Sequence, residues 1–493
     1  MESRPSSERL RSPPTLRQMD DRSQSGRAPG CCSLRLGLAL LLHFCNVSMM
    51  SQRACLSLTM VAMVNGTGPQ ELPNASTPEP LDDPRNPVYN WSPRTQGIVL
   101  SSSTYGMLLS QVPVGYLSGI YPVKNMVGSA LLLSSLLSLL VPLAAGVGAS
   151  AVIACRVAQG LSQGTVLVAQ HTVWTKWAPL SERGRLTSLS LSGLMLGPSL
   201  ALCVTGLICQ ALGWPMVFYV FGAGGCALSL CWFLLFHDDP KGHPCISPGE
   251  KELIASSLVE QVGSAGKSVP IRAVLKSLPV WAISLGCFAF SWTNHVMFLY
   301  LPTFISSKLH VNVRENGLLS ALPHLFCWLL GILAGHVSDG FLSRKMLSVL
   351  AVRKLFTALG LLLPAVFVVS LLYLGPSFQG TVTCLTLASA TLGFCVAGIV
   401  INPLDIAPRY YGFLKGVTVL IGMTGGLISS TLAGIVLDQV RRGSCQPGGG
   451  RSVFIIHHQT LGEARGPGEG GGEGGCHRAR PSGPDAQRHR KRS

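Results

Sequence analysis

The sequence predicts an all-α protein that spans a membrane many times and folds as two lobes, with six spans in the first and five in the second. Hydrophobic residues make up 47% of the 493 residues and charged residues only 12%, about half the share found in soluble domains. The apolar residues come in runs of about 20, the length that crosses a hydrocarbon layer about 30 Å thick. Loop motifs of the first half also recur in the second. These features exclude a soluble enzyme, a disulfide scaffold and a nucleic-acid module, so we expect no enzymatic activity and no metal or cofactor.

The apolar runs follow a polar N-terminus, 1–35, for which we expect no folded structure. The first run is not followed by a small-residue cleavage site, which favours a retained span over a removed signal peptide. A charged central loop, 237–276, separates a first lobe, 36–236, from a second lobe, 277–438. The predicted spans are 36–64, 97–120, 126–146, 150–174, 187–210, 215–236, 277–302, 317–337, 349–374, 379–402 and 412–437.

The formal net charge of +16 is concentrated in the N-terminus, in alternate loops and in the C-terminal tail. Cations beside membrane spans stay on the cytoplasmic side and attract anionic lipid. We therefore expect a cytoplasmic N-terminus and contact with membrane lipid, and no nucleic-acid partner. The loop cations behind this orientation are Lys124, Lys176, Arg183, Arg185, Arg344, Lys345, Arg353, Lys354, Arg409 and Lys415.

Three glycosylation sequons support the same orientation. Asn65, Asn74 and Asn90 all lie in the loop 65–96, which carries few cations and is predicted to be non-cytoplasmic. Asparagine is glycosylated only in loops on that side. The sequon at Asn46 lies inside the first span, where we expect no glycan.

Two loop motifs occur twice, about 220–230 residues apart. GYLSGIYPVK ends the second span and GHVSDGFLSRK ends the eighth, and charged segments after the fourth and tenth spans also correspond. A six-span unit used twice is typical of a transporter that binds its substrate near the bilayer midplane, between the lobes. The glycines and charged ends could pair across the cytoplasmic face and hold one conformation. The predicted latch residues are Gly115, Gly119, Lys124, Gly335, Asp339, Arg344, Asp405 and Arg409.

Five stretches carry a resemblance to a known family: Tyr89 to Ser103, Arg156 to Gly164, Lys176 to Leu186, Asn316 to Leu325 and Asn402 to Gly416. Through them the chain resembles the major facilitator superfamily, and within it the sodium-phosphate and vesicular glutamate anion transporters. The resemblance covers about residues 33–439. It implies the two-lobe major facilitator fold, anion transport by alternating access, and a multi-pass location in the apical plasma membrane.

Two arginines stand out deep inside predicted spans, where an ionisable group is costly and usually functional. Arg53 is in the first span and Arg156 in the fourth, and the resemblance implies that both helices line the central cavity. Guanidinium groups suit a carboxylate, a phosphate or a urate-like anion because they donate two parallel hydrogen bonds. The alternative is that the arginines extend to the outer interface, which suits Arg156 better than Arg53. Both match arginines that the family uses for substrate anions.

Three positions depart from the family pattern. Gln163 replaces a glutamate of the proton-coupled relatives, and Leu100 and Phe290 replace a histidine and an arginine of the glutamate carriers. We include Gln163 with Arg53 and Arg156 as a predicted substrate-binding residue. Because glutamine and leucine do not titrate, we expect the proton pathway of those relatives to be absent.

The driving force stays open between two alternatives. Membrane potential is worth about 2.3 kcal/mol per charge per 100 mV and fits a carrier of urate or other organic anions. Sodium-dependent phosphate cotransport instead needs Na⁺ as coupling ion, although no span holds an obvious carboxylate site for it. Four histidines inside spans lack an acidic partner three or four positions away, which favours polar packing or cavity lining over a proton relay. They are His43, His171, His295 and His324.

The resemblance ends near Gln439, where a Gly-, Pro- and Arg-rich tail, 439–493, replaces the expected twelfth span. This composition cannot bury a core, so we expect the tail to be disordered. Its ten Lys and Arg residues prefer the cytoplasm, whereas eleven spans from a cytoplasmic N-terminus place it outside. The alternative function is therefore a truncated, transport-deficient form that modulates a complete transporter. The sequence identifies no PDZ-type or other scaffold partner.

Overall fold

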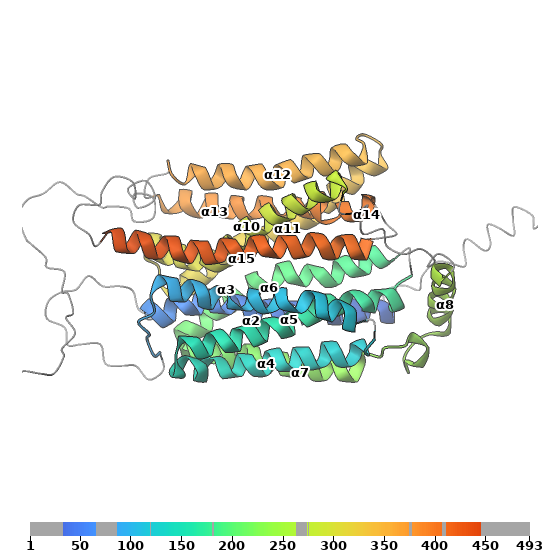
Figure 1. The fold of residues 1–493 in the computed structure, drawn as a ribbon, viewed down its shortest axis with the longest axis horizontal. Coiled ribbons are helices and arrows are strands. Elements are labelled where there is room, and N and C mark those ends of the chain that lie inside the picture. Colours follow the sequence, from blue (N-terminus) through green and yellow to red (C-terminus); the bar gives the residue numbers. More distant parts are fainter. Residues whose placement is uncertain are drawn as a thin grey trace, which may run out of the picture.

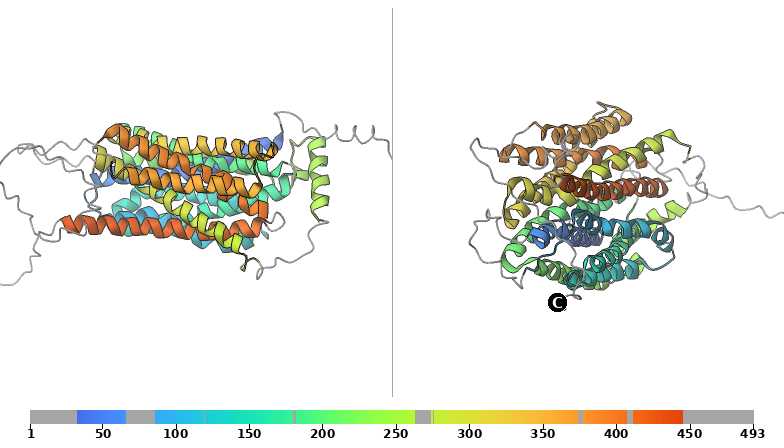
Figure 2. Two further views of the ribbon diagram at one scale, coloured as in Figure 1. Left: turned by 90° about the horizontal axis from the view of Figure 1, so that it is seen from above. Right: turned by 60° about the vertical axis from the view of Figure 1, so that its left-hand side comes forward.

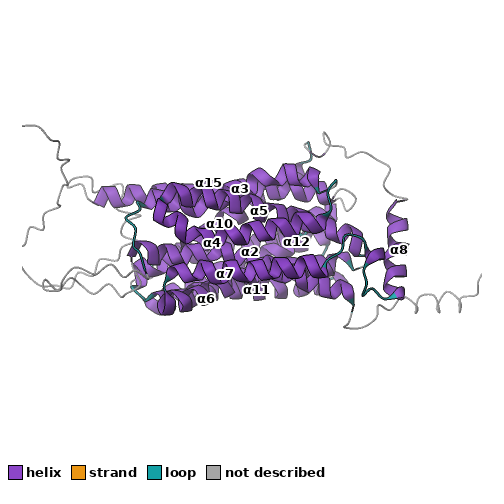
Figure 3. Cartoon of the chain, turned by 90° about the horizontal axis from the view of Figure 1, so that it is seen from below, coloured by secondary structure: helices purple, strands orange, loops and turns teal. Residues whose placement is uncertain are grey.

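The computed structural model describes residues 33–65, 86–118, 120–179, 182–262, 274, 276–373, 377–406 and 411–444. Within these ranges the protein is helical, and its long helices run side by side as one elongated bundle (Figure 1). A cartoon coloured by secondary structure shows the same bundle from below (Figure 3). The expected unfolded N-terminus before Ser33, the tail after Ser444 and Arg409 lie outside the described residues.

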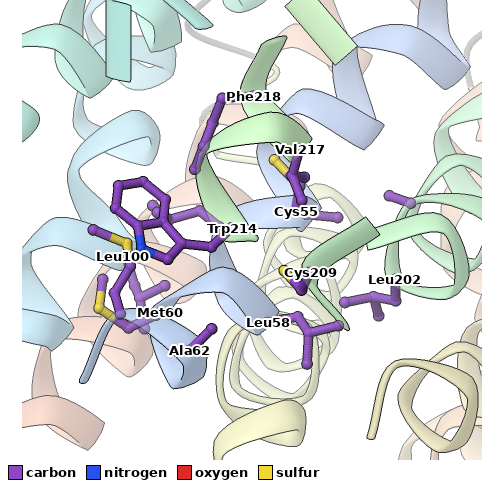
Figure 4. Close-up of a cluster of buried hydrophobic side chains, with 14 of the residues drawn as sticks. Cys55, Leu58, Met60, Ala62, Leu100, Leu202, Cys209, Trp214, Val217 and Phe218 are labelled. Atoms are coloured by element: carbon purple, nitrogen blue, oxygen red, sulfur yellow. The ribbon is translucent and has the colours of Figure 1, made fainter. Parts of the chain in front are cut away.

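The first lobe begins with α2, and its helices are α2 (Leu34–Asn65), α3 (Pro93–Leu117), α4 (Val123–Val147), α5 (Ala149–Trp177), α6 (Arg183–Leu212) and α7 (Trp214–Leu235). Within the lobe α2 packs along α6, α3 along α5, and α4 along both α5 and α7. Cys55, Leu58 and Met60 of α2 are buried in an apolar cluster with Trp214 and Phe218 of α7 (Figure 4). This cluster fixes the part of α2 that follows Arg53.

The second lobe consists of α10 (Leu278–Leu309), α11 (Val313–Ser343), α12 (Val349–Ser370), α13 (Phe378–Leu392), η2 (Val396–Val400), α14 (Asn402–Ile406) and α15 (Tyr411–Ser444). Helix α10 packs along α15, and α13 packs against α11 and α12. The predicted tenth span contains the π-helical turn η2, which hydropathy does not reveal. Helix α15 extends seven residues beyond the predicted end of the eleventh span.

Ten helices of the described chain are long and apolar enough to cross a membrane. Helix α3 is the eleventh long helix and is less apolar, because Ser101, Ser102, Ser103 and Thr104 follow one another in its middle. All four side chains are buried. A polar run that faces the protein interior lowers the mean hydropathy of a span without exposing polar atoms to lipid.

A short helix, α8 (Pro248–Val262), lies across one end of the bundle, nearly at right angles to the long helices (Figures 1 and 2). It belongs to the central loop, which therefore contains a helix. We call this end of the bundle proximal and the opposite end distal. The Glu250 side chain of α8 accepts hydrogen bonds from the Ser33 hydroxyl and from the backbone and side chain of Arg35. These contacts fasten α8 to the start of α2.

The lobes meet along α6 with α11, α3 with α15, and α2 with α10. Glycines form the closest contacts, and these lie at the distal end. A Cβ atom built on Gly97 of α3 would lie 2.8 Å from the Cα atom of Gly434 on α15, and one built on Gly317 of α11 would lie 2.9 Å from the Cα atom of Gly206 on α6. At the proximal end, a Cβ atom on Gly115 would meet no atom within 4 Å. The lobes are therefore in close contact at the distal end.

Candidate anion site

Arg53 lies at the junction of the two lobes and is only 5% exposed. Its Nη2 atom donates to the Thr104 hydroxyl of α3 at 2.8 Å and to Nε2 of His295 on α10 at 3.1 Å. Its Nη1 atom lies 3.3 Å from the Met107 sulfur, and the guanidinium carbon lies 5.4 Å from the centre of the Phe298 ring. One guanidinium group of α2 thus contacts both α3 of the first lobe and α10 of the second.

No carboxylate neutralises this charge among the described residues. The ion pairs there join Arg35 to Glu182 and Glu250, and Arg353 to Asp405. The Nε atoms of Arg53 and Arg156 are buried, and neither has a hydrogen-bond partner within the described chain. A buried cation without a counter-ion is strongly unfavourable, so a buried arginine with a free donor is poised to bind an anion.

Arg156 lies behind Arg53, inside the first lobe, and is 1% exposed. It donates to the backbone carbonyls of Gln52 at 3.0 Å and Arg53 at 3.3 Å, and to the Gln159 side chain at 2.7 Å. The structure therefore brings the two predicted arginines together. In this conformation the terminal nitrogens of Arg156 hold the α2 backbone that carries Arg53.

Gln163 also lies inside the first lobe. Its amide nitrogen is 3.3 Å from the Ser134 hydroxyl and 3.4 Å from the Met49 carbonyl, and its carbonyl oxygen has no partner among the described residues. Ser134 in turn donates to Gln52 at 2.7 Å. Gln163 and Arg156 thus belong to one polar network between α2, α4 and α5, and this network adjoins Arg53.

His295 is the contact of Arg53 that sequence patterns missed. Its sequence surroundings resemble those of three other intramembrane histidines, because none of the four has an acidic residue three or four positions away. His43 contacts the Leu189 carbonyl and His324 the Ser320 carbonyl, as expected for polar packing. His295 instead faces a cation from the other lobe, 242 positions away in the sequence, and no local spacing reveals such a pair.

The two remaining departures from the family pattern lie in apolar surroundings. Leu100 is 2% exposed within the core of the first lobe. Phe290 packs in the second lobe beside Ile283, Cys395 and Ile399. Neither position carries a group that could titrate or bind an anion.

Comparison with known proteins agrees with this architecture. The family model described as Major Facilitator Superfamily matches residues 42–433. The chain belongs to the Major Facilitator Superfamily.

Within this superfamily the chain is similar to proteins named for anion transport. It is 59% identical to the sodium-dependent phosphate transport protein 1 of Oryctolagus cuniculus, over 85% of this chain and 90% of that protein. It is 47% identical to sodium-dependent phosphate transport protein 3 of Homo sapiens, over 86% of this chain and 99% of that protein. It is 46% identical to the probable small intestine urate exporter of Homo sapiens, over 87% and 88%.

Solved structures of low identity share the fold. A bacterial homolog of the human lysosomal transporter Spinster matches with a TM-score of 0.64 at 15% identity, over 84% of each chain. A D-xylose-proton symporter matches with a TM-score of 0.56 at 14% identity, over 86% of this chain and 95% of that chain.

The residues predicted as a conformational latch are only partly brought together. Asp405 accepts from Nε of Arg353 at 2.6 Å, and Arg353 also donates to Ser338 and to the Ala397 carbonyl of η2. The Lys124 backbone donates to Asp238. Gly115, Asp339 and Arg344 are exposed, Gly335 is half-buried, and Gly119 and Arg409 lie outside the described residues.

The sequon asparagines are placed unequally. Asn90 is exposed in the segment before α3, Asn65 is the last residue of α2, and Asn74 lies outside the described residues. Asn46 is fully buried and donates to Gln170 at 2.9 Å and to the Ser190 carbonyl at 2.8 Å. Asn46 therefore forms part of the helix packing.

Proposed function

We propose that this chain is a secondary transporter that moves small anions across a membrane by alternating access, with Arg53 as the principal anion-binding residue. The observation that carries the proposal is a buried guanidinium at the lobe junction with no carboxylate partner among the described residues. The names of the similar proteins point to phosphate and urate as candidate substrates. Both are anions whose oxygens can accept from a guanidinium.

Arg156 and Gln163 have a supporting role in this proposal. The Arg156 contacts to the carbonyls of Gln52 and Arg53 fix the α2 turn that presents the Arg53 side chain. The second positive charge raises the potential at the site and strengthens anion binding there. The free Nε atom of Arg156 is available to an anion when the lobes rearrange.

Two energy sources fit the site. A net positive site without a titratable carboxylate suits transport driven by membrane potential. Sodium coupling, which the names of two relatives state for those proteins, would need neutral oxygen ligands here. The acidic residues of the described chain lie in loops, in α8, in α14 or near the ends of long helices.

The family resemblance supports a place in the apical plasma membrane, and loop charge and sequons support an N-terminus and α8 in the cytoplasm. Leu230, Leu234 and Leu285 are more than 60% exposed on the flanks of the bundle, as expected for side chains that contact lipid. With this orientation the glycine contacts between the lobes lie on the outer side, which supports a conformation closed on that side.

Flux in proteoliposomes tests this function. An imposed potential should drive phosphate or urate flux by the wild-type protein and by Arg94→Gln, whose arginine is exposed at the start of α3. Arg53→Gln should abolish it. Flux that persists in Arg53→Gln contradicts the proposed site. Separate runs with and without Na⁺ distinguish the two energy sources.

A second candidate function is modulation of a complete transporter by a transport-deficient form. The sequence after Gln439 favours it, because the longest apolar run there, Val453 to Ile456, is far below spanning length. Wild-type protein that binds anion but carries no flux would favour this candidate. Co-expression with a complete relative would then show whether flux by that relative changes.

A further inference from the structure

The hydrogen bonds of His295 determine its protonation state in this conformation. Its Nδ1 atom lies 3.0 Å from the Ser291 carbonyl oxygen, which can only accept, so Nδ1 carries a hydrogen. Its Nε2 atom lies 3.1 Å from Nη2 of Arg53, which can only donate, so Nε2 offers its lone pair. His295 is therefore neutral, and it occupies one of the hydrogen-bond donors that an anion would use.

The packing around His295 leaves the ring little freedom to turn away. On α15, a Cβ atom built on Gly426 would lie 2.4 Å from Nδ1, so the ring rests against the backbone of that helix. The ionisable residues of α15 are each more than ten positions from Gly426 in the sequence: Tyr411, Lys415, Asp438, Arg441 and Arg442. From α2 the ring faces Arg53, and Arg156 lies directly behind Arg53.

An anion at Arg53 changes what Nε2 encounters. The ionised oxygens of an anion offer only lone pairs, so a neutral Nε2 beside one of them is repelled and left without a donor. Protonated Nε2 donates to the anion instead, and the anion then lies between two cations from different lobes. Binding of the anion and protonation of His295 therefore favour each other, because each is stronger when the other is present.

We propose that His295 is the anion-binding residue of the second lobe and takes up one proton with each anion. The proton comes from water and adds to the Nε2 lone pair. The hydrogen bond from Arg53 to Nε2 breaks, and Arg53 and His295 then both donate to the anion. The inference rests on the proposed function of Arg53. It also implies that the two negative charges of an anion such as hydrogen phosphate are balanced by the positive charges of Arg53 and His295, which both contact it.

The chain provides a matched control. His324 on α11 has the same hydrogen bond from Nδ1 to the carbonyl four residues earlier, 3.0 Å to Ser320, and its ring packs edge-on against Phe298. Its contacts do not include Arg53. Replacement of His324 by glutamine therefore removes a buried imidazole of similar setting without affecting the proposed proton site.

Calorimetry with inorganic phosphate tests the proposal on the purified full-length chain. Titrations at pH 6–8 in buffers of different ionisation enthalpy give the protons taken up per phosphate bound. Phosphate titrates by itself in this range, so the same titrations are repeated with sulfate, which does not titrate there and reports only the proton taken up by the protein. The wild-type protein and His324→Gln should take up close to one proton more than His295→Gln. As the pH increases, the ratio of the wild-type Kd to the Kd of His295→Gln should rise by up to about tenfold for each pH unit.

The outcomes separate the two proposals. Phosphate binding that persists in Arg53→Gln overturns the proposed site itself. Binding that requires Arg53, with equal proton uptake in wild type and His295→Gln, overturns only the role of His295. If His295→Gln does not fold, ¹⁵N-histidine spectra of the wild type decide: one neutral imidazole should become an imidazolium when phosphate is added, and an unchanged spectrum contradicts the inference.

Discussion

Arg53 on α2 donates to His295 on α10 across 3.1 Å, and this hydrogen bond joins the two lobes at the middle of the bundle. Its donor is a permanent cation, and its acceptor can be replaced by any better acceptor that enters the site. An anion is such an acceptor. The lobes are thus joined by a contact that substrate binding would alter, which relates the binding site to movement of the lobes.

Replacement of Arg53 by lysine tests whether the forked geometry matters beyond the charge. Lysine keeps the charge but cannot donate in parallel to an anion and to Thr104. We expect the Kd for phosphate to rise by roughly ten- to hundredfold, which corresponds to about 1.4–2.8 kcal/mol. Arg94→Lys, at an exposed arginine, should leave the Kd unchanged. If Arg53→Lys and Arg94→Lys bind phosphate with equal affinity, the bidentate role of Arg53 is contradicted.

Substitution of Gly97 should disturb the closed distal end. A valine there places a Cβ atom 2.8 Å from the Cα atom of Gly434, so the two helices must separate. We expect faster amide hydrogen exchange in the distal turns of α3 and α15. Gly115→Val is the control, since a Cβ atom there meets no atom within 4 Å. Equal exchange in the two variants would argue against a tight distal contact.

Removal of the Glu250 charge should release α8 from the first lobe. Glu250 is 3% exposed and accepts from Ser33 and Arg35, so Glu250→Gln should lower the free energy of unfolding by about 2 kcal/mol. Thermal unfolding measures this loss, and limited proteolysis of the central segment should become faster. Glu252→Gln, at an exposed position one residue beyond Lys251, is the matched control and should resemble the wild type.

The pKa of Glu250 sets the pH at which this contact fails. Burial acts to raise the pKa, but hydrogen bonds from Ser33 and Arg35 outweigh it and hold the pKa below its ordinary value. A carboxyl with a lowered pKa stabilises the fold above its unfolded pKa of about 4.3 and loses that contribution as pH falls through the folded value. Proteolysis of α8 should therefore be independent of pH near neutrality and increase only in acid. An increase between pH 6 and 8 would contradict this account.

Glycosylation mapping tests the predicted orientation. Asn74→Gln should remove one glycan and increase mobility on a gel after expression in animal cells. Asn46→Gln should leave the glycan mass unchanged, because the Asn46 side chain is fully buried and bonded to Gln170. A loop 65–96 that carries no glycan in any variant would argue against its position outside the cytoplasm.

Much of the fold could be predicted because membrane spans depend on local composition. Runs of apolar residues located the long helices, and the Ser92–Pro93 pair, an N-cap followed by proline, marks the start of α3 four residues before the predicted span. The turn η2 could not be predicted. Its Ala397 carbonyl accepts from Arg353, so the contact depends on a residue of another helix.

The candidate site was predictable in part for the same reason. Arg53 and Arg156 are recognisable as cations inside apolar runs, whereas their partners depend on how the helices are packed. His295 is 242 positions from Arg53 and Glu250 is 215 from Arg35. The side-chain direction of Arg156, toward carbonyls of α2, likewise depends on the approach of α5 to α2.

The most direct measurement is an experimental structure of the protein with inorganic phosphate bound. Our account predicts phosphate oxygens within hydrogen-bond distance of the Arg53 guanidinium and of His295 Nε2, in place of the hydrogen bond between these two groups. Phosphate bound elsewhere in the molecule, with Arg53 still bonded to Thr104, Met107 and His295, would contradict it.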